Sequence, residues 1–279
     1  MEFSITRFNP EDIPFGKSLT DIEGWHRTTA DWERLLRLEP DGVFKAVSEG
    51  KDAGIAAVLS YGRLAWIHSV IVLPEHRRKG LARALMVQCI RFARTKGAEC
   101  IKLDAVPEAK LFYKGLGFIE EFESKRLIRS GMMCLRLAEK MKLSDLDEVF
   151  AFDHAQTGLS RGRVLKDIFR ENQSWGFMVK GPAGIRGYML GREGDVRVNI
   201  GPIVCVKDDE RCAMDLIKSA LGQAPDRTFR ACVAGANARA VKVFKSLKFE
   251  ESESSTRMYM GKSFHESDSD YAMISAEKG

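Results

Sequence analysis

A run of basic residues joins an apolar segment to a helix-like segment, and its chemistry suits a phosphate. The run Arg77-Arg78-Lys79-Gly80 follows residues 64–72, whose apolar and β-branched side chains predict a buried strand. An amphipathic helical pattern begins at Gly80. The start of a helix has unpaired backbone N–H groups and the positive end of the helix dipole, so it attracts anions. The sequence therefore predicts a site for a phosphate or pyrophosphate at this strand-to-helix connection.

A second motif lies about thirty positions further on, in residues 111–118, which read Leu-Phe-Tyr-Lys-Gly-Leu-Gly-Phe. Together with the spacing Arg77-x-x-Gly80-x-Ala82 after a strand, it resembles the GNAT superfamily of acetyltransferases. A short motif gains weight when its structural context also fits, as it does here. The resemblance is strong in the first half of the chain and weak in the second.

The resemblance implies that coenzyme A is the cosubstrate and that no metal is needed. Its pantetheine arm would pair with backbone groups at the end of the strand, and its pyrophosphate would meet the loop and the first helical turn. Gly80 and Ala82 would leave room for the diphosphate to approach the backbone. The cofactor-binding residues expected on this basis are Val70, Ile71, Val72, Arg77, Arg78, Lys79, Gly80, Leu81 and Ala82. Many family members also have an asparagine early in the fourth helix, where this sequence has Val106.

The reaction implied is attack of a neutral amine on a thioester, with a thiolate as the leaving group. Tyr113 occupies the position of the family's general acid, although an aromatic ring that only packs the helix on the sheet is the alternative. An alkylamine is mostly protonated at neutral pH, so some group must accept its proton. His68 on the strand before the loop and Asp104 at the end of the next strand are the two candidates for this base. Either residue could instead be purely structural.

The hydrophobic pattern predicts an α/β fold with a mixed sheet. A strand over residues 4–8 precedes helices near 10–19 and 29–38, and a hairpin over 43–48 and 53–61 follows. The helix from Gly80 separates two strand-like segments, which implies a parallel crossover. The remaining elements expected are a strand at 100–105, a helix at 107–116 and a last strand in the 120s.

The second half of the chain repeats the first. Residues 112–118 resemble residues 243–249 at a shift of 131 positions, which predicts two copies of one fold joined near Gly131. The first copy is residues 1–131, and the second copy, with a C-terminal tail, is residues 132–279. The same shift, without a gap, carries Phe44 to Trp175, Val72 to Ile203, and Leu85 to Leu216.

The same shift predicts that the second copy is degenerate. It matches Arg77–Gly80 with Asp208-Asp209-Glu210-Arg211, and this acidic, crowded loop would repel a pyrophosphate. Carboxylates that cap a helix are the plainer explanation of these residues, and it leads to the same conclusion. The shift also puts Phe244 in the place of Tyr113, Asn199 in the place of His68, and Asn237 in the place of Val106.

Composition narrows the class of protein. The chain has 279 residues, of which 44% are hydrophobic and 30% charged, as in soluble globular proteins. No apolar run is long enough to span a membrane, and the N-terminus does not resemble a signal peptide. The six cysteines form no C-x-x-C pair, which favours reduced thiols in the cytoplasm and argues against zinc. The net charge of +5 is spread along the chain, so nucleic acid is not the expected partner.

These observations predict a cytoplasmic acyl-CoA-dependent N-acyltransferase, most simply an acetyltransferase, whose first copy alone binds the cosubstrate. The alternative is a non-catalytic acyl-CoA-binding or regulatory module. In the family the first two helices form the acceptor site, and here Trp25 could line it while Trp32 belongs to an apolar stripe. The acceptor is a small-molecule or peptide amine whose identity the sequence leaves open, as it does the acyl length. Both a monomer, as an internal pseudo-dimer, and a homodimer are compatible with two copies.

Overall fold

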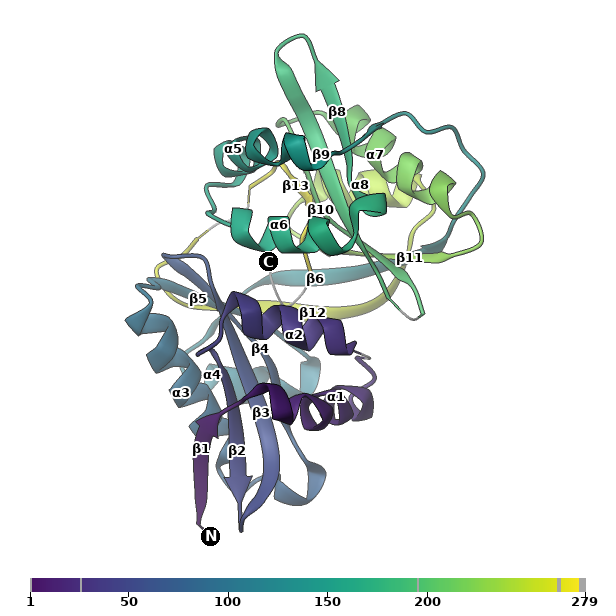
Figure 1. Ribbon diagram of the computed structural model, residues 1–279. Helices are drawn as coiled ribbons and strands as arrows, with labels where there is room; N and C mark the ends of the chain where they lie inside the picture. Colours follow the sequence, from purple (N-terminus) through teal and green to yellow (C-terminus); the bar gives the residue numbers. More distant parts are fainter. Residues whose placement is uncertain (1, 26, 195, 265–266, 276–279) are drawn as a thin grey trace. The chain divides into compact units, whose positions relative to one another are not determined.

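The chain forms two compact units, which are described separately. The computed structural model describes residues 2–25, 27–194, 196–264 and 267–275. The first unit contains Met1–Leu103 and Tyr259–Ser263, and the second contains Asp104–Met258 and Phe264–Gly279 (Figure 1). Among the helices of the described part, none has the length and apolar character that crossing a bilayer would require.

The first unit contains the elements expected for the first copy up to its fifth strand. These are β1 (Phe3–Arg7), η1 (Pro10–Asp12), α1 (Ile13–Ile22), α2 (Thr29–Leu38), β2 (Val43–Ser48), β3 (Lys51–Ser60), β4 (Leu64–Val72), η2 (Pro74–His76), α3 (Leu81–Thr95) and the start of β5 (Cys100–Ala105). The strands are ordered β1-β2-β3-β4-β5, and every pair is antiparallel except β4–β5, which is parallel. The predicted mixed sheet and parallel crossover are therefore confirmed.

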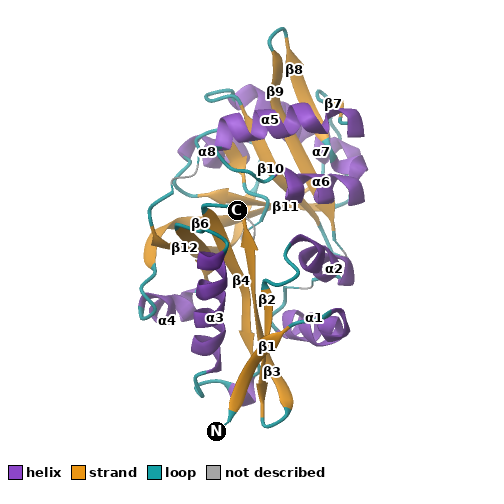
Figure 2. Cartoon of the chain, turned by 60° about the vertical axis from the view of Figure 1, so that its left-hand side comes forward, coloured by secondary structure: helices purple, strands orange, loops and turns teal. Residues whose placement is uncertain are grey.

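Helices cover both faces of the first unit's sheet (Figure 2). Val43 and Ile55 face one side, where they share a core with Trp32 of α2. Phe44, the next residue on β2, faces the other side, and its ring meets Phe92 of α3 with the centroids 5.8 Å apart. This follows from the alternation of side chains along a strand. Trp32 is fully buried and thus belongs to the core, as its apolar stripe indicated.

The second unit repeats this arrangement with extra strands. It contains η3 (Pro107–Ala109), α4 (Lys110–Lys114), β6 (Ile119–Ser130), β7 (Glu139–Lys140), η4 (Leu143–Asp145), α5 (Leu146–Thr157), α6 (Gly162–Glu171), η5 (Gln173–Trp175), β8 (Phe177–Gly181), β9 (Gly184–Glu193), β10 (Val198–Cys205), α7 (Glu210–Gln223), β11 (Thr228–Ala234), α8 (Ala238–Ser246), β12 (Glu250–Gly261) and β13 (Asp270–Ala272). Its strand order is β12-β6-β11-β10-β9-β8-β7, with β13 on β10. A core of residues such as Phe177, Leu216 and Phe244 fills the space between this sheet and helices α7 and α8.

The two units differ from the two copies of the sequence because the second unit includes the first copy from Asp104 on, and the first unit includes Tyr259–Ser263 of the second copy. β6 belongs to the first copy, yet it pairs antiparallel with β11 inside the second unit, from Ser124 opposite Ala234 to Ser130 opposite Thr228. Lys262, from the end of the second copy, belongs to the first unit, where its ammonium lies 2.9 Å from the Glu99 carboxylate. The division at Gly131 thus separates two repeats of sequence, whereas the compact units follow strand pairing.

The gap-free shift of 131 positions is corrected by the strand register. Gly54 opposite Val72 in the first copy corresponds to Gly187 opposite Cys205 in the second, which is a shift of 133 for both members of the pair. The shift is 131 only towards the end of each copy. There the Phe118 N–H bonds to the Tyr113 carbonyl, as the Phe249 N–H does to the Phe244 carbonyl. Insertions and deletions lie between these points.

Candidate functional site

The start of α3 has the geometry expected of an anion site. Gly80 is the N-cap, in a left-handed conformation with φ +88°, and no side chain of the described residues caps the helix there. The first turn also carries no acidic residue. A Cβ added at Gly80 would meet only Phe3, at 4.0 Å, so within the protein the glycine is favoured by its backbone conformation and its surroundings are open. The backbone N–H groups of the first turn are thus left without a carboxylate partner.

The basic loop divides its cations between two tasks. Arg77 donates from Nε to the Val72 carbonyl at 2.9 Å, and its guanidinium pairs with Glu23 at 2.6 Å. This side chain therefore fastens the loop to the end of β4. Arg78, with φ +60°, and Lys79 pair with no carboxylate among the described residues, and their positive charge lies beside the helix start. These two cations are the ones available to an anion.

β4 contains an irregularity just before the loop. Ile71 lies opposite Ile55, whereas His68 lies opposite Ala57, so β4 has one extra residue between these pairs. Ser69 within this bulge has φ +53°, a left-handed conformation that is costly for a residue with a side chain. The pairing of β4 with β5 also ends early, at Trp66 opposite Lys102. The predicted pantetheine-binding stretch, residues 70–72, therefore lies past the last β4–β5 pair.

His68 is buried at this bulge with two polar neighbours. Its Nδ1 lies 2.9 Å from the Ser69 hydroxyl and 3.4 Å from the Arg27 guanidinium. An arginine can only donate, so Nδ1 acts as the acceptor and we assign the ring proton to Nε2. A proton added to Nδ1 would bring a second positive charge next to Arg27, which disfavours His68 as the base. Sequence reasoning did not find these roles of Arg27 and Ser69.

Asp104 is placed differently from the expectation that it serves as a base. In the second unit its carboxylate accepts hydrogen bonds from Arg257 at 3.1 and 2.9 Å and from the Ser124 hydroxyl at 2.6 Å. The side chains of Asp104 and Arg257 are 4% and 0% exposed. These contacts suit a structural role in joining strands, which is the alternative the sequence left open, and the role of Asp104 as a base stays a prediction. Its partner stands 153 positions away, so no local signal could have revealed the pair.

Tyr113 is a buried residue of α4 in the second unit. Its ring meets Phe118 at a centroid distance of 6.1 Å and Phe112 at 5.2 Å. These contacts agree with the packing role that the sequence left open, and they leave the role of general acid untested. The structure brings together the predicted residues of β4, the loop and α3, all of which belong to the first unit, and Tyr113 is a residue of the second unit.

The corresponding connection in the second copy is closed. Four residues, 206–209, join β10 to α7, whereas eight, 73–80, join β4 to α3. The N-cap in the second copy is Asp209, whose carboxylate accepts from the Cys212 N–H at 3.0 Å and pairs with Arg186 at 2.6 Å. Gly80 therefore corresponds to Asp209 rather than to Arg211, because the second loop is four residues shorter. The expected acidic character of this helix start is confirmed.

The corrected register also changes the counterpart of His68. Ile67 opposite Val58 matches Ile200 opposite Gly191, so His68 corresponds to Gly201 and not to Asn199. The match of Val106 with Asn237 stands, since each is the N-cap of the helical segment that follows.

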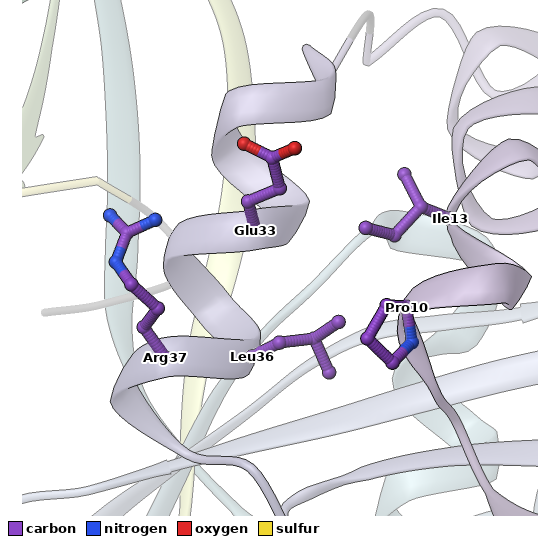
Figure 3. Close-up of a pocket in the computed structure, with 5 residues that line it drawn as sticks. All are labelled: Pro10, Ile13, Glu33, Leu36 and Arg37. Carbon is purple, nitrogen blue, oxygen red and sulfur yellow. The ribbon is translucent and has the colours of Figure 1, made fainter.

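A shallow hollow of about 380 Å³ lies on the first two helices of the first unit. Pro10, Ile13 and Leu36 form its apolar part, and Glu33 and Arg37 lie one turn apart on α2 beside it (Figure 3). None of its lining residues belongs to the basic loop. Trp25, the predicted acceptor-site residue, lies outside this hollow and is 37% exposed.

The described residues contain no group of three or more His, Cys, Asp or Glu side chains placed to bind a metal ion. The six cysteines form no disulfide.

Two family models match the chain, one in each copy. The model described as the acetyltransferase (GNAT) family matches residues 11–118, and the model described as an acetyltransferase (GNAT) domain matches residues 149–271. The two stretches together cover most of the chain.

Curated relatives and solved structures agree with these matches. Holothin acyltransferase of Pseudoalteromonas sp. (strain SANK 73390) is 25% identical over 245 residues, covering 86% of this chain and 82% of that protein. An uncharacterized N-acetyltransferase of Methanocaldococcus jannaschii is 30% identical over 125 residues, 41% of this chain and 54% of that protein. A candidate acetyltransferase structure from Pyrococcus horikoshii has a TM-score of 0.83 at 23% identity, covering 99% of this chain and 96% of that one. A tandem GNAT protein from the clavulanic acid biosynthesis pathway has a TM-score of 0.66 at 12% identity, covering 93% and 98%. At these identities the two structures show the fold.

Proposed function

Because the chain belongs to the GNAT family of acetyltransferases and carries two such domains in tandem, we propose that its first copy transfers an acetyl group from acetyl-CoA to a primary amine. Acyl transfer is the activity of this family. In this proposal residues 1–131 bind the cosubstrate and carry out the reaction, and residues 132–279 have a supporting role.

The observation that carries the proposal is the open start of α3. A left-handed glycine, uncapped backbone N–H groups and two available cations, Arg78 and Lys79, are what a pyrophosphate requires. In the proposed complex, backbone groups from Arg77 to Ala82 bind the pyrophosphate. The backbone of residues 70–72, which lies past the last β4–β5 pair, binds the amides of the pantetheine arm.

Acetyl-CoA supplies a thioester carbonyl that a neutral amine can attack. The N–H groups near the β4 bulge are the proposed donors to the carbonyl oxygen as it gains negative charge. Tyr113 is the proposed donor of a proton to the leaving thiolate. Since Arg27 disfavours a proton on His68 Nδ1, we assign removal of the amine proton to water and assign His68 the role of supporting the bulge through Ser69.

The acceptor proposed is a small-molecule amine. Holothin acyltransferase matches this chain across both copies, so holothin is the first acceptor to try. Trp25 is exposed after α1 in the segment that the family uses for acceptors, and it would offer an apolar wall.

The test is thiol release from acetyl-CoA in the presence of a panel of amines. The panel contains holothin, polyamines, amino acids, aminosugars and peptides with free N-termini or lysines. The proposal expects turnover with at least one small amine, together with an acetylated product of the corresponding mass. Tight binding of coenzyme A without turnover on any acceptor would favour the acyl-CoA-binding module instead. A preference for peptides would overturn the acceptor class.

A further inference from the structure

The C-terminal segment of the chain lies between two strands of the second unit. β10 and β11 are parallel neighbours, but they pair only from Val198 opposite Phe229 to Ile200 opposite Ala231. Beyond this point β13 takes the place next to β10, with Ala272 opposite Ile203, and Met273 bridges to Cys232 of β11. The tail therefore completes the sheet where β10 and β11 separate.

Backbone hydrogen bonds join the tail to both strands. The Cys205 N–H donates to the Ser269 carbonyl at 3.0 Å, and the Met273 N–H donates to the Cys232 carbonyl at 2.9 Å. The Asn237 side chain, at the start of α8, donates to the Asp270 carbonyl at 3.1 Å. An added strand that bonds through its main chain is a common mode of peptide recognition.

The side chains of the tail are enclosed as well. Tyr271, Ala272, Met273 and Ile274 are each at most 2% exposed. The Asp270 carboxylate lies 3.3 Å from the guanidinium of Arg161, which is itself 1% exposed. A buried arginine that meets a carboxylate of the tail provides specificity in addition to the strand pairing.

The body of the second copy is shaped for this segment. A Cβ added at Gly201 would lie 2.1 Å from the Met273 carbonyl oxygen, so a side chain there would exclude the tail. Arg257 also donates to the Met273 sulfur at 2.8 Å. Gly201 belongs to β10 and Arg257 to β12, so two strands of the second copy contact Met273.

The first copy differs at the corresponding strands. The pairing of β4 with β5 also stops after three residues, at Trp66 opposite Lys102, but in the described residues no further strand pairs with β4 on that side. Both copies thus have parallel strands that part, and only the second has a segment of its own chain placed there.

We propose that the second copy is a binding site for an extended peptide, and that its occupant is the chain's own segment Ser269–Ile274. In the proposed function the pantetheine arm lies beside β4 of the first copy, and this segment takes the corresponding place beside β10. Only this comparison rests on the proposed function. The capped, acidic start of α7 excludes a pyrophosphate from the same copy. The tail therefore completes this copy without a cosubstrate.

The test uses the full chain with a specific protease site in place of residues 265–266. After cleavage, the fragment beginning at Ser267 is expected to stay with the protein through gel filtration. An excess of a labelled peptide spanning 267–275 is expected to replace it slowly, while millimolar coenzyme A leaves it bound. A fragment that separates at once, or that coenzyme A displaces, would overturn the proposal.

The matched variants are Asp270→Ala and Tyr271→Ala, with Lys262→Ala as the control outside the segment. The first two are expected to speed release of the fragment at least tenfold, and the control is expected to leave it unchanged. In the uncleaved Tyr271→Ala chain, amide hydrogen exchange at Cys205 should accelerate to a similar degree, while α3 keeps its protection. Unchanged exchange at Cys205 would contradict the proposal.

Coenzyme A binding to the same samples is measured separately. If coenzyme A fails to bind while the fragment stays, the proposed function fails and the peptide site stands. If coenzyme A binds while the fragment is lost at once, the peptide site fails and the proposed function stands.

Discussion

The starts of α3 and α7 show how one structural element can be open to an anion in one copy and closed in the other. α3 begins after eight connecting residues with a left-handed glycine, and two cations lie beside it. α7 begins after four connecting residues, and the Asp209 carboxylate accepts a hydrogen bond from the Cys212 N–H and pairs with Arg186. A helix start capped by its own carboxylate has one donor fewer for a phosphate and repels it by charge. The two helix starts thus differ in both loop length and charge.

The largest effect is expected from giving the first helix start the residue of the second. Aspartate adopts the left-handed conformation more readily than most residues, so Gly80→Asp should keep the fold. It places a carboxylate beside the backbone N–H groups of the first turn of α3. Coenzyme A affinity should fall by roughly 100-fold or more because the anion loses donors and meets a like charge. Titration calorimetry measures this.

The matched control for that change is Asp209→Asn in the second copy. Asparagine caps a helix about as well as aspartate does, so the fold should be kept while the charge is removed. Coenzyme A affinity should not change. Equal losses in the two variants would contradict the assignment of the site to the first copy.

The next effect concerns the aromatic residue of the motif that both copies share. Tyr113→Phe should lower kcat by roughly 10- to 100-fold if the hydroxyl donates a proton to the thiolate, with KM for acetyl-CoA little changed. Phe244→Tyr in the second copy should change neither constant. Steady-state kinetics with the best acceptor of the panel checks both, and an unchanged kcat in Tyr113→Phe would leave that tyrosine with packing alone.

A smaller effect is expected from the cations of the two loops. The double variant Arg78→Ala with Lys79→Ala should weaken coenzyme A binding by about tenfold, and the loss should shrink as salt rises because these charges are exposed. Arg239, which pairs with Asp208 at 2.6 Å beside the second helix start, supplies the control. Arg239→Ala should leave binding unchanged at every ionic strength. Affinities measured between low and high salt would reveal any contribution from the second loop.

The smallest effect concerns the strand end that the second copy gives to the first unit. Hydrogen bonds from Arg63 and then Lys262 lower the pKa of Glu99 to about 2, against a usual value of 4.5. A depressed carboxyl pKa means that the ionised form favours folding, so this contribution is present above pH 4.5 and is lost as the pH falls towards 2. Since the group is exposed, the change in stability should be small.

Two measurements check this. An NMR titration of the Glu99 side chain should show a midpoint near pH 2. Glu99→Gln should be less stable than the parent at pH 6 and equal to it below pH 2. A midpoint at the ordinary value would show that neither Arg63 nor Lys262 binds the Glu99 carboxylate in solution.

The fold and the open helix start could be predicted because their signals are local. Residues 64–72 alternate little and are strongly apolar, and the basic run with Gly80 marks the next helix directly in the sequence. The pairing of β6 with β11 of the second copy could not be predicted in this way. Residues 119–130 and 250–261 both read as strands, but the pattern of a strand does not say which neighbour it will pair with.

Errors in the site came from relations between distant residues. The shift of 131 positions was correct at Tyr113 and Phe244, yet it failed at His68 because the strand register there gives a shift of 133. The connection from β10 to α7 is four residues shorter than that from β4 to α3, and two of these residues are regained before Phe249. Asp104 was a candidate base by position, and its contact with Arg257 is visible only in the fold. The apolar residues 271–274 in an otherwise polar tail indicate a segment that is buried in the fold. A single sequence does not identify the strands with which this segment pairs.

Counting coenzyme A per chain tests the central claim most directly. Calorimetric titration of the full chain should give one molecule bound per chain, and the Gly80→Asp variant should bind none in the same concentration range. Two molecules bound per chain, or one that survives Gly80→Asp and is lost in a variant of residues 206–209, would contradict the account.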